Sequence, residues 1–203
     1  MREEVADLSA MIRTDHLTGL FNRRHLHYVL EQEIERTKRG KHPTTLILID
    51  IDHFKKINDN YGHITGDQAL VHIARLIQST VRRLDIPCRY GGEELAVVLP
   101  TTHTMIGTQV AERIRLAIAT HPLEHNDQSI AITASLGVAS YTQTDKDSVD
   151  GFIGRTDAQL YQAKEAGRNQ VRTARPTVES RSQISDEERN ALFAPDDNDV
   201  HNC

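Results

Sequence analysis

Apolar residues recur at intervals of three and four along much of the chain, and short runs of consecutive apolar residues interrupt this pattern. The helical spacing predicts helices over residues 1–13, 22–39, 54–61, 67–83, 105–119 and 148–165. The β-branched and apolar runs predict strands over residues 44–50, 88–90, 95–99, 130–141 and 170–172. Helices interspersed among about five strands indicate an α/β (α+β) fold, in which helices surround a central mixed sheet.

The pair Gly91-Gly92 separates two of the predicted strands. Because glycine accommodates positive φ at both central positions of a tight turn, this pair predicts an antiparallel β-hairpin. Two adjacent acids, Glu93 and Glu94, follow the glycines and project from a turn where the backbone can come close to a ligand. Such a pair also occurs in ordinary solvated turns, so the hairpin alone does not distinguish a ligand-binding site from a solvated turn.

The composition divides the chain into three parts. Residues 14–173 contain the alternating elements and form one folded domain. Residues 1–13 form a short amphipathic helix, which is either the end of a coiled linker from an upstream sensory domain or a helix that packs on its own domain. Residues 174–203 are rich in polar and acidic residues, and we expect a mostly disordered tail there.

Composition and charge argue against several classes of protein. No apolar run approaches the roughly 20 residues that cross a bilayer, and the charged N-terminus has no signal-peptide core. We therefore expect a cytoplasmic protein without membrane contact. The formal charge of −5 argues against bulk attraction to nucleic acid. Only two cysteines are present, Cys88 and Cys203, so no disulfide framework is available.

Acidic residues come abruptly at the end of the most apolar predicted strand, as Asp50 and Asp52. Ligand sites of α/β sheets lie at the carboxyl ends of strands. If the glycine hairpin lies beside this strand, Asp50, Glu93 and Glu94 converge, and clustered carboxylates favour Mg²⁺ or Mn²⁺. Such ions near a phosphate indicate phosphoryl or nucleotidyl transfer. Asp52 has a common alternative role as the cap of the following helix.

Basic residues that could bind phosphate stand at two places. Lys55 and Lys56 lie in the first turn of the helix after the acidic strand end, where free backbone N–H groups also favour anions. Lys164 and Arg168 are four residues apart at a predicted helix end, so they are expected to share a face and grip one phosphate group. Taken singly, they are better explained by favourable placement against the helix dipole.

Five motifs together resemble the GGDEF family of diguanylate cyclases over about residues 14–172. The signature loop is residues 91–95 (GGEEL), and the accessory motifs are residues 15–24 (DHLTGLFNRR), 50–59 (DIDHFKKIND), 62–67 (GHITGD) and 158–169 (AQLYQAKEAGRN). Leu95 stands where the family usually has Phe, and we expect it to pack in the core as a strand residue. Glu93 preserves the carboxylate of the usual Asp, so no ligand position is lost.

The resemblance implies a nucleotidyl-cyclase-like fold with a metal site. Asp50 and Glu93 would bind up to two Mg²⁺ or Mn²⁺ ions, with the Ile51 carbonyl as a further ligand and Glu94 completing the second site. Glu93 would also assist deprotonation of a ribose 3′-hydroxyl.

The resemblance also implies how GTP is held. Asn58 and Asp67 match the residues that hydrogen-bond the guanine edge, which an amide and a carboxylate suit. The phosphates would be bound by the cations of Lys55, Lys164 and Arg168 and by backbone N–H groups around Phe54.

The family reaction joins two GTP molecules, each held by one subunit, into cyclic di-GMP, so the resemblance implies a homodimer. It also implies a product-inhibition site at Arg82 and Asp85, with Arg113 as its third member. A salt bridge that ends a helix is the alternative explanation of this Arg-x-x-Asp spacing.

Two other functions remain open at this point. One is a catalytically inactive member of the family, a receptor of GTP or cyclic di-GMP that acts through a partner protein. The other is a cyclase on a related fold that makes a cyclic mononucleotide. The intact set of Asp50, Glu93 and Glu94 favours the diguanylate cyclase, because a receptor has no need of all three acids.

Overall fold

The computed structural model describes residues 13–40, 42–126 and 128–174. Except for one residue each, the predicted N-terminal helix and the predicted tail lie outside these residues. Within them, the chain forms a six-stranded mixed sheet, a two-stranded sheet and five helices. The predicted mixed sheet surrounded by helices is therefore confirmed.

The helices vary in length from two to five turns. They are α2 (Arg23–Gly40), α3 (Phe54–Tyr61), α4 (His63–Thr80), α5 (Thr104–Thr120) and α6 (Val149–Glu165). The large sheet has the spatial order β1 (Phe21–Asn22), β3 (Ile86–Arg89), β4 (Glu94–Leu99), β2 (Thr44–Ile51), β7 (Ala134–Tyr141) and β8 (Val171–Thr173). The small sheet pairs β5 (Leu123–His125) with β6 (Gln128–Ile130).

The centre of the large sheet is antiparallel, because β2 lies between β4 and β7 and runs opposite to both. The edge strands β1 and β8 run parallel to their neighbours. The predicted glycine hairpin is present as the antiparallel pair of β3 and β4. The sixth strand, β1, has only two residues, which is too short for a periodic pattern to reveal.

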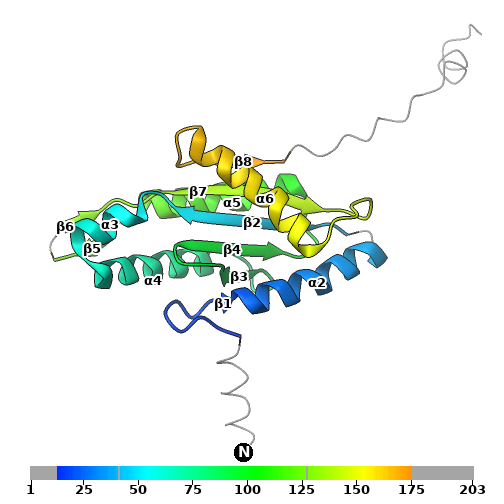
Figure 1. Cartoon of the computed structure of the whole chain (residues 1–203), viewed down its shortest axis with the longest axis horizontal. Coiled ribbons are helices and arrows are strands. Elements are labelled where there is room, and N and C mark those ends of the chain that lie inside the picture. The colour runs from blue at the N-terminus through cyan, green and yellow to red at the C-terminus, as the bar shows by residue number, and fades with distance from the viewer. Residues whose placement is uncertain (1–12, 41, 127, 175–203) are drawn as a thin grey trace, which may run out of the picture.

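The side chains of β2 alternate between two apolar cores, one on each face of the sheet. Leu46 and Leu48 pack with α2 and α6, whereas Ile47 and Ile49 pack with α3, α4 and α5. Figure 1 shows this layering, with α6 crossing in front of β2 and α5 lying behind the sheet. All eight residues of β2 are buried, as expected for a strand covered on both faces.

The largest errors in the predicted bounds fall in two elements. The predicted strand over residues 130–141 is split, because residues 131–133 leave the sheet, and the Thr133 carbonyl accepts a hydrogen bond of 2.9 Å from the Asp52 backbone N–H. Helix α4 begins at His63, before the predicted start at Asp67. Its first turn contains Thr65 and Gly66, whose low helix propensity conceals the start of the helix.

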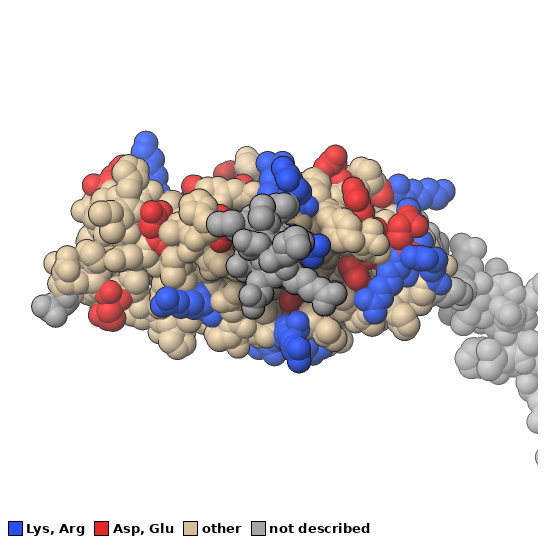
Figure 2. Space-filling model, turned by 90° about the horizontal axis from the view of Figure 1, so that it is seen from below, with Lys and Arg blue, Asp and Glu red and all other residues tan. Residues whose placement is uncertain are grey.

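One face of the described surface mixes charges of both signs. On the face drawn in Figure 2, Lys and Arg side chains stand among Asp and Glu side chains and do not merge into one basic surface. On this face, phosphate binding would therefore depend on individually placed cations. No helix of the described ranges is both long and apolar enough to cross a membrane.

Candidate active site

The acids at the end of β2 lie next to the glycine hairpin. In the antiparallel register of β2 and β4, Asp50 is directly opposite Glu94, so both side chains leave the same face of the sheet. The negative charge of Glu93, one residue earlier in the hairpin, also acts on Asp50. The structure thus brings Asp50 near the two acids of the hairpin, which the sequence places in a separate motif.

A lysine from α6 covers the acid at the end of β2. Lys164 Nζ lies 2.8 Å from Asp50 Oδ2, and the Asp50 side chain is only 12% exposed. Burial raises the pKa of Asp50 above its ordinary value, although the Lys164 hydrogen bond acts in the opposite direction. Burial and the charge of Asp50 likewise raise the pKa of Glu94. Ionised carboxylates here need a positive charge beside them.

The donor set fits a hard divalent cation that shares its coordination with substrate. In the described part of the chain, no three His, Cys, Asp or Glu side chains are grouped closely enough to bind one metal by themselves. Mg²⁺ usually takes one or two carboxylates together with substrate phosphate oxygens, and does not need a cage made of protein alone. Asp50 and Glu94 could supply those carboxylates, and the Ile51 carbonyl a further oxygen.

The two glycines of the hairpin are explained differently from the prediction. Neither Gly91 nor Gly92 has a positive φ, so the expected backbone requirement is wrong. Gly91 is instead restricted by space, because a Cβ there would lie 2.9 Å from Glu94 Oε2. The hairpin closes through hydrogen bonds from the Tyr90 and Gly91 N–H groups to the Glu94 carbonyl. Glycine therefore leaves room for the acid beside it.

Arg89 fixes the hairpin to the loop before β1. Its Nη1 lies 3.2 Å from both carboxylate oxygens of Asp15, and its Nε and Nη2 donate to the carbonyls of Gly91 and Gly92. Burial disfavours the Asp15 carboxylate, but hydrogen bonds from Thr18 and Arg89 outweigh it and lower its pKa. The sequence argument assigned no role to Arg89 or Asp15. The signal was present as opposite charges, because Asp15 begins one quoted motif and Arg89 lies two residues before the signature loop.

A cavity of about 500 Å³ opens between the hairpin and the first helices after β2. Four predicted substrate-binding residues line it, namely Phe54, Lys55, Asn58 and Asp67. The predicted catalytic acid Glu93 lines it as well. His63, Leu70 and Arg89 also line it, and sequence reasoning missed them. A Cβ on Gly66 would overlap Asn58 Oδ1, so this glycine creates the space for the Asn58 side chain.

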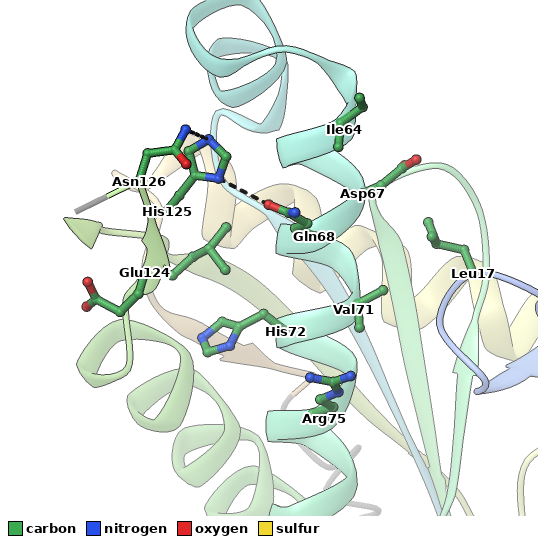
Figure 3. A pocket seen from close by; sticks show the side chains of 11 residues that line it. Leu17, Ile64, Asp67, Gln68, Val71, His72, Arg75, Glu124, His125 and Asn126 are labelled. Carbon is green, nitrogen blue, oxygen red and sulfur yellow. Dashed lines mark hydrogen bonds between the residues drawn. The ribbon is translucent and has the colours of Figure 1, made fainter. Parts of the chain in front are cut away.

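A second cavity, of about 620 Å³, lies on the other side of α4. Figure 3 shows Gln68 pointing toward the β5–β6 hairpin, where its Oε1 is 3.2 Å from His125 Nδ1. In the same view Asp67 points away from that hairpin. Asp67 lines both cavities, but its direction leaves it available to the cavity beside Asn58.

The predicted phosphate-binding cations come from two helices and from the turn after the second. Lys55 lies in the first turn of α3, as expected. The shared helical face predicted for Lys164 and Arg168 is wrong, because α6 ends at Glu165 and Arg168 follows in a left-handed conformation with φ of 65°. Asp52 is not the cap of α3 either, since His53 occupies that position. Its carboxylate accepts hydrogen bonds from β7 and from the turn after α6.

Sequence comparison supports one family for this arrangement. The family described as "Diguanylate cyclase, GGDEF domain" matches residues 12–170. The chain belongs to the GGDEF family. The response regulator PleD of Caulobacter vibrioides is 42% identical over 160 residues, which are 78% of this chain and 35% of PleD. The chain therefore spans about a third of the length of that relative.

Solved GGDEF structures have the same fold. The coiled coil and GGDEF domain of DgcB from Caulobacter crescentus, in complex with c-di-GMP, superimposes with a TM-score of 0.80 at 32% identity, covering 85% of this chain and 91% of that one. The active GGEEF domain of a diguanylate cyclase from Vibrio cholerae gives a TM-score of 0.70 at 39% identity, covering 76% and 97%. The second structure has Glu at the third signature position, as this GGDEF chain does.

The predicted inhibitory residues of this GGDEF chain lie together at the C-terminal end of α4. Arg113 of α5 donates to the carbonyl of Thr80, the last residue of α4, over 3.4 Å. Asp85 accepts a 2.8 Å hydrogen bond from the backbone N–H of Arg82 and not from its guanidinium. The predicted alternative, a salt bridge that ends the helix, is therefore wrong. Both arginine side chains are exposed.

The variant residue of the signature is placed as expected. Leu95 is fully buried in the core beneath α4 and α5, where it leaves the sheet on the face opposite to Glu94. Its neighbours in β4, Ala96 and Val98, pack on the other face. The absence of Phe at this position thus concerns packing, and the acids beside it keep their register with β2.

Proposed function

We propose that residues 14–173 are the catalytic domain of a diguanylate cyclase, which condenses two GTP molecules into cyclic di-GMP and releases two pyrophosphates. The observation that carries this proposal is the cross-strand pair of Asp50 and Glu94, next to a cavity lined by Asn58, Asp67 and Glu93. Membership of the GGDEF family, and relatives named diguanylate cyclase, support it.

The reaction is two nucleotidyl transfers. In each, the ribose 3′-oxygen of one GTP forms a bond to the α-phosphorus of the other, and the bond from that phosphorus to the α–β bridging oxygen breaks. Pyrophosphate leaves with the electron pair of the broken bond. Glu93 lines the nucleotide cavity, and we assign it the role of accepting the proton of the 3′-hydroxyl.

Asp50, Glu93 and Glu94 would hold up to two Mg²⁺ or Mn²⁺ ions, together with the Ile51 carbonyl. When bound, these ions supply charge stabilisation for the attacking and leaving oxygens. The raised pKa values of Asp50 and Glu94 support this assignment, since both carboxylates lack sufficient positive charge in the protein alone. Lys164 provides part of that charge through its 2.8 Å contact with Asp50.

The substrate contacts follow from the lining of the cavity. Asp67 can accept hydrogen bonds from the N1–H and N2–H₂ groups of guanine, and the Asn58 amide can donate to and accept from the same base. The phosphates would bind to the cations of Lys55, Lys164 and Arg168, and to the backbone N–H groups around Phe54 at the start of α3.

One subunit holds one GTP, so turnover requires two subunits with facing sites. Cyclic di-GMP would bind back to Arg82, Asp85 and Arg113, where guanidinium groups can pair with guanine or phosphate, and would inhibit the enzyme.

The test is the product spectrum from GTP and Mg²⁺ at several protein concentrations, analysed by chromatography. We expect cyclic di-GMP and pyrophosphate in a ratio of one to two, and a rate per subunit that rises with concentration as dimers form. GTP binding without any product from a confirmed dimer would support the inactive receptor instead. A cyclic mononucleotide as product would support a cyclase on a related fold instead.

A further inference from the structure

Asp52 is a buried carboxylate that the proposed chemistry does not use. It is 6% exposed and lies just beyond the end of β2. Its Oδ1 accepts a 2.7 Å hydrogen bond from Ser135 Oγ, and its Oδ2 accepts one of 2.7 Å from Thr133 Oγ1 and one of 3.0 Å from the backbone N–H of Asn169. A buried carboxylate with three hydrogen-bond partners is held in one position and orientation.

The third of these hydrogen bonds reaches a strained turn. Arg168 and Asn169 have φ values of 65° and 44°, a left-handed conformation that costs non-glycine residues of order 1 kcal/mol each. Such a conformation persists only where surrounding contacts hold it. The Arg168 side chain is exposed, so the direction in which it leaves the protein depends on the backbone of this turn.

A second contact, from another element, holds the same turn. Arg115 of α5 donates from Nη1 to Asn169 Oδ1 over 2.9 Å, while its Nε donates to Glu112 over 2.7 Å. The backbone of Asn169 is thus held by the end of β2 and its side chain by α5. The position of the turn therefore depends on the acidic end of β2, where Asp50 lies two residues before Asp52.

We propose that Asp52 is a positioning residue, which holds the Arg168–Asn169 turn so that the Arg168 guanidinium faces the triphosphate of the bound nucleotide. Arg115 is the weaker second support of the same turn. This inference rests on the proposed function, because it requires a guanine nucleotide in the site. Asp52 itself touches neither the nucleotide nor a metal, and it acts through Arg168.

The test compares nucleotides with and without the outer phosphates. Binding of α,β-methylene-GTP and of GMP, each with Mg²⁺, is measured by calorimetry. Asp52→Ala removes all three acceptor contacts, and we expect affinity for the methylene analogue to fall about tenfold, as for one lost contact to a charged group, with GMP affinity unchanged. In an Arg168→Ala background, Asp52→Ala should cause no further loss.

Two matched variants separate positioning from a loss of packing. Asp52→Asn should restore affinity, because its amide oxygen can accept from Asn169 and Thr133 while its NH₂ group donates to Ser135. Thr133→Val removes one hydrogen bond of Asp52 but leaves the bond to Asn169, so it should lower the melting temperature without changing affinity for the analogue.

Several outcomes would overturn the inference. Asp52 does not act through Arg168 if Asp52→Ala lowers the affinity for GMP and for the analogue equally. The same holds if Asp52→Ala still lowers affinity in the Arg168→Ala background, or if it lowers affinity for neither nucleotide. If Asp52→Ala does not fold, Arg115→Ala replaces it, with an expected loss of about threefold for the analogue only, and no loss would overturn the inference. If the unmodified protein binds neither nucleotide, the proposed function itself fails.

Discussion

The acidic end of β2 and the arginines at the end of α4 are both charged sites, but they are built in different ways. Asp50 is buried, is opposite Glu94 in a strand register, and is already paired with Lys164. Arg82 and Arg113 are exposed, and the Asp85 carboxylate beside them bonds to backbone. One site is part of the sheet, and the other lies on the surface.

The difference follows from the cost of burying charge. A buried carboxylate must have a partner, so the fold supplies Lys164 and leaves the pKa of Asp50 raised even so. Exposed guanidinium groups are solvated and need no partner in the free protein. The acidic end is therefore organised before any ligand binds, whereas the arginines are expected to be ordered by their ligand.

The largest expected effect comes from neutralising the buried acid. Asp50→Asn keeps the shape of the side chain but removes the charge proposed to bind metal, so we expect turnover to fall about a thousandfold or more. Pyrophosphate release from GTP measures this. Asp150→Asn, which neutralises an exposed acid on α6, should retain full activity. If Asp50→Asn retained even about a tenth of the rate, its role as a metal ligand would be rejected.

The preformed cavity can be disturbed without changing any charge. Gly66→Ala places a methyl group on Asn58 Oδ1, so Asn58 must move and the KM for GTP should rise about tenfold. Steady-state kinetics measure the change. Gly154→Ala in α6 is the matched control, since its Cβ meets nothing within 4 Å, and it should leave KM unchanged. Equal KM values for both variants would show that Asn58 does not contact the base.

The exposed arginines should matter only when product is present. Arg82→Ala removes one side chain without disturbing the core, so we expect inhibition by cyclic di-GMP to weaken about tenfold while the initial rate stays within about twofold. Initial rates at increasing product concentration provide the measurement. The neighbouring Arg83→Ala should behave as the unmodified protein does. An unchanged inhibition constant in Arg82→Ala would make this motif structural.

The smallest effect is on stability and depends on pH. Burial and Asp50 raise the pKa of Glu94, so the folded protein binds this proton more tightly than the unfolded chain does. The resulting stabilisation is present below the ordinary carboxyl pKa and is lost as the pH rises through the raised value. At pH 7, with a metal chelator present, the charge of Glu94 therefore destabilises the folded protein. Glu94→Gln removes that charge and should raise the melting temperature by about 2 °C.

Scanning calorimetry at two pH values checks the cause of this gain. Near pH 4 the difference between Glu94→Gln and the unmodified protein should shrink strongly, because Glu94 is then mostly protonated in both the folded and the unfolded states. Glu31→Gln, at an exposed position of α2, should have no effect at either pH. A gain of equal size at both pH values would assign the effect to packing and not to charge.

Local patterns were sufficient for most of the elements and for the family. The β-branched and apolar run around residues 44–50 predicted the central strand, and the period of the helices predicted α2, α5 and α6 to within a few residues. These features depend on neighbours in the sequence, so a short window contains the information. The boundary at Asp67 failed for the same reason, since weak helix formers at the start of α4 hide the helix from a local pattern.

The sequence by itself determined which acids, amides and cations are present, and their spacing was enough to identify the family. Only the tertiary structure decided that Asp50 faces Glu94 and Lys164, that Arg168 leaves a left-handed turn and not a helical face, and that Asp52 holds this turn and does not cap a helix. The reason is physical. Strand register and buried hydrogen bonds join residues that are far apart in the chain, and no local propensity specifies those partners.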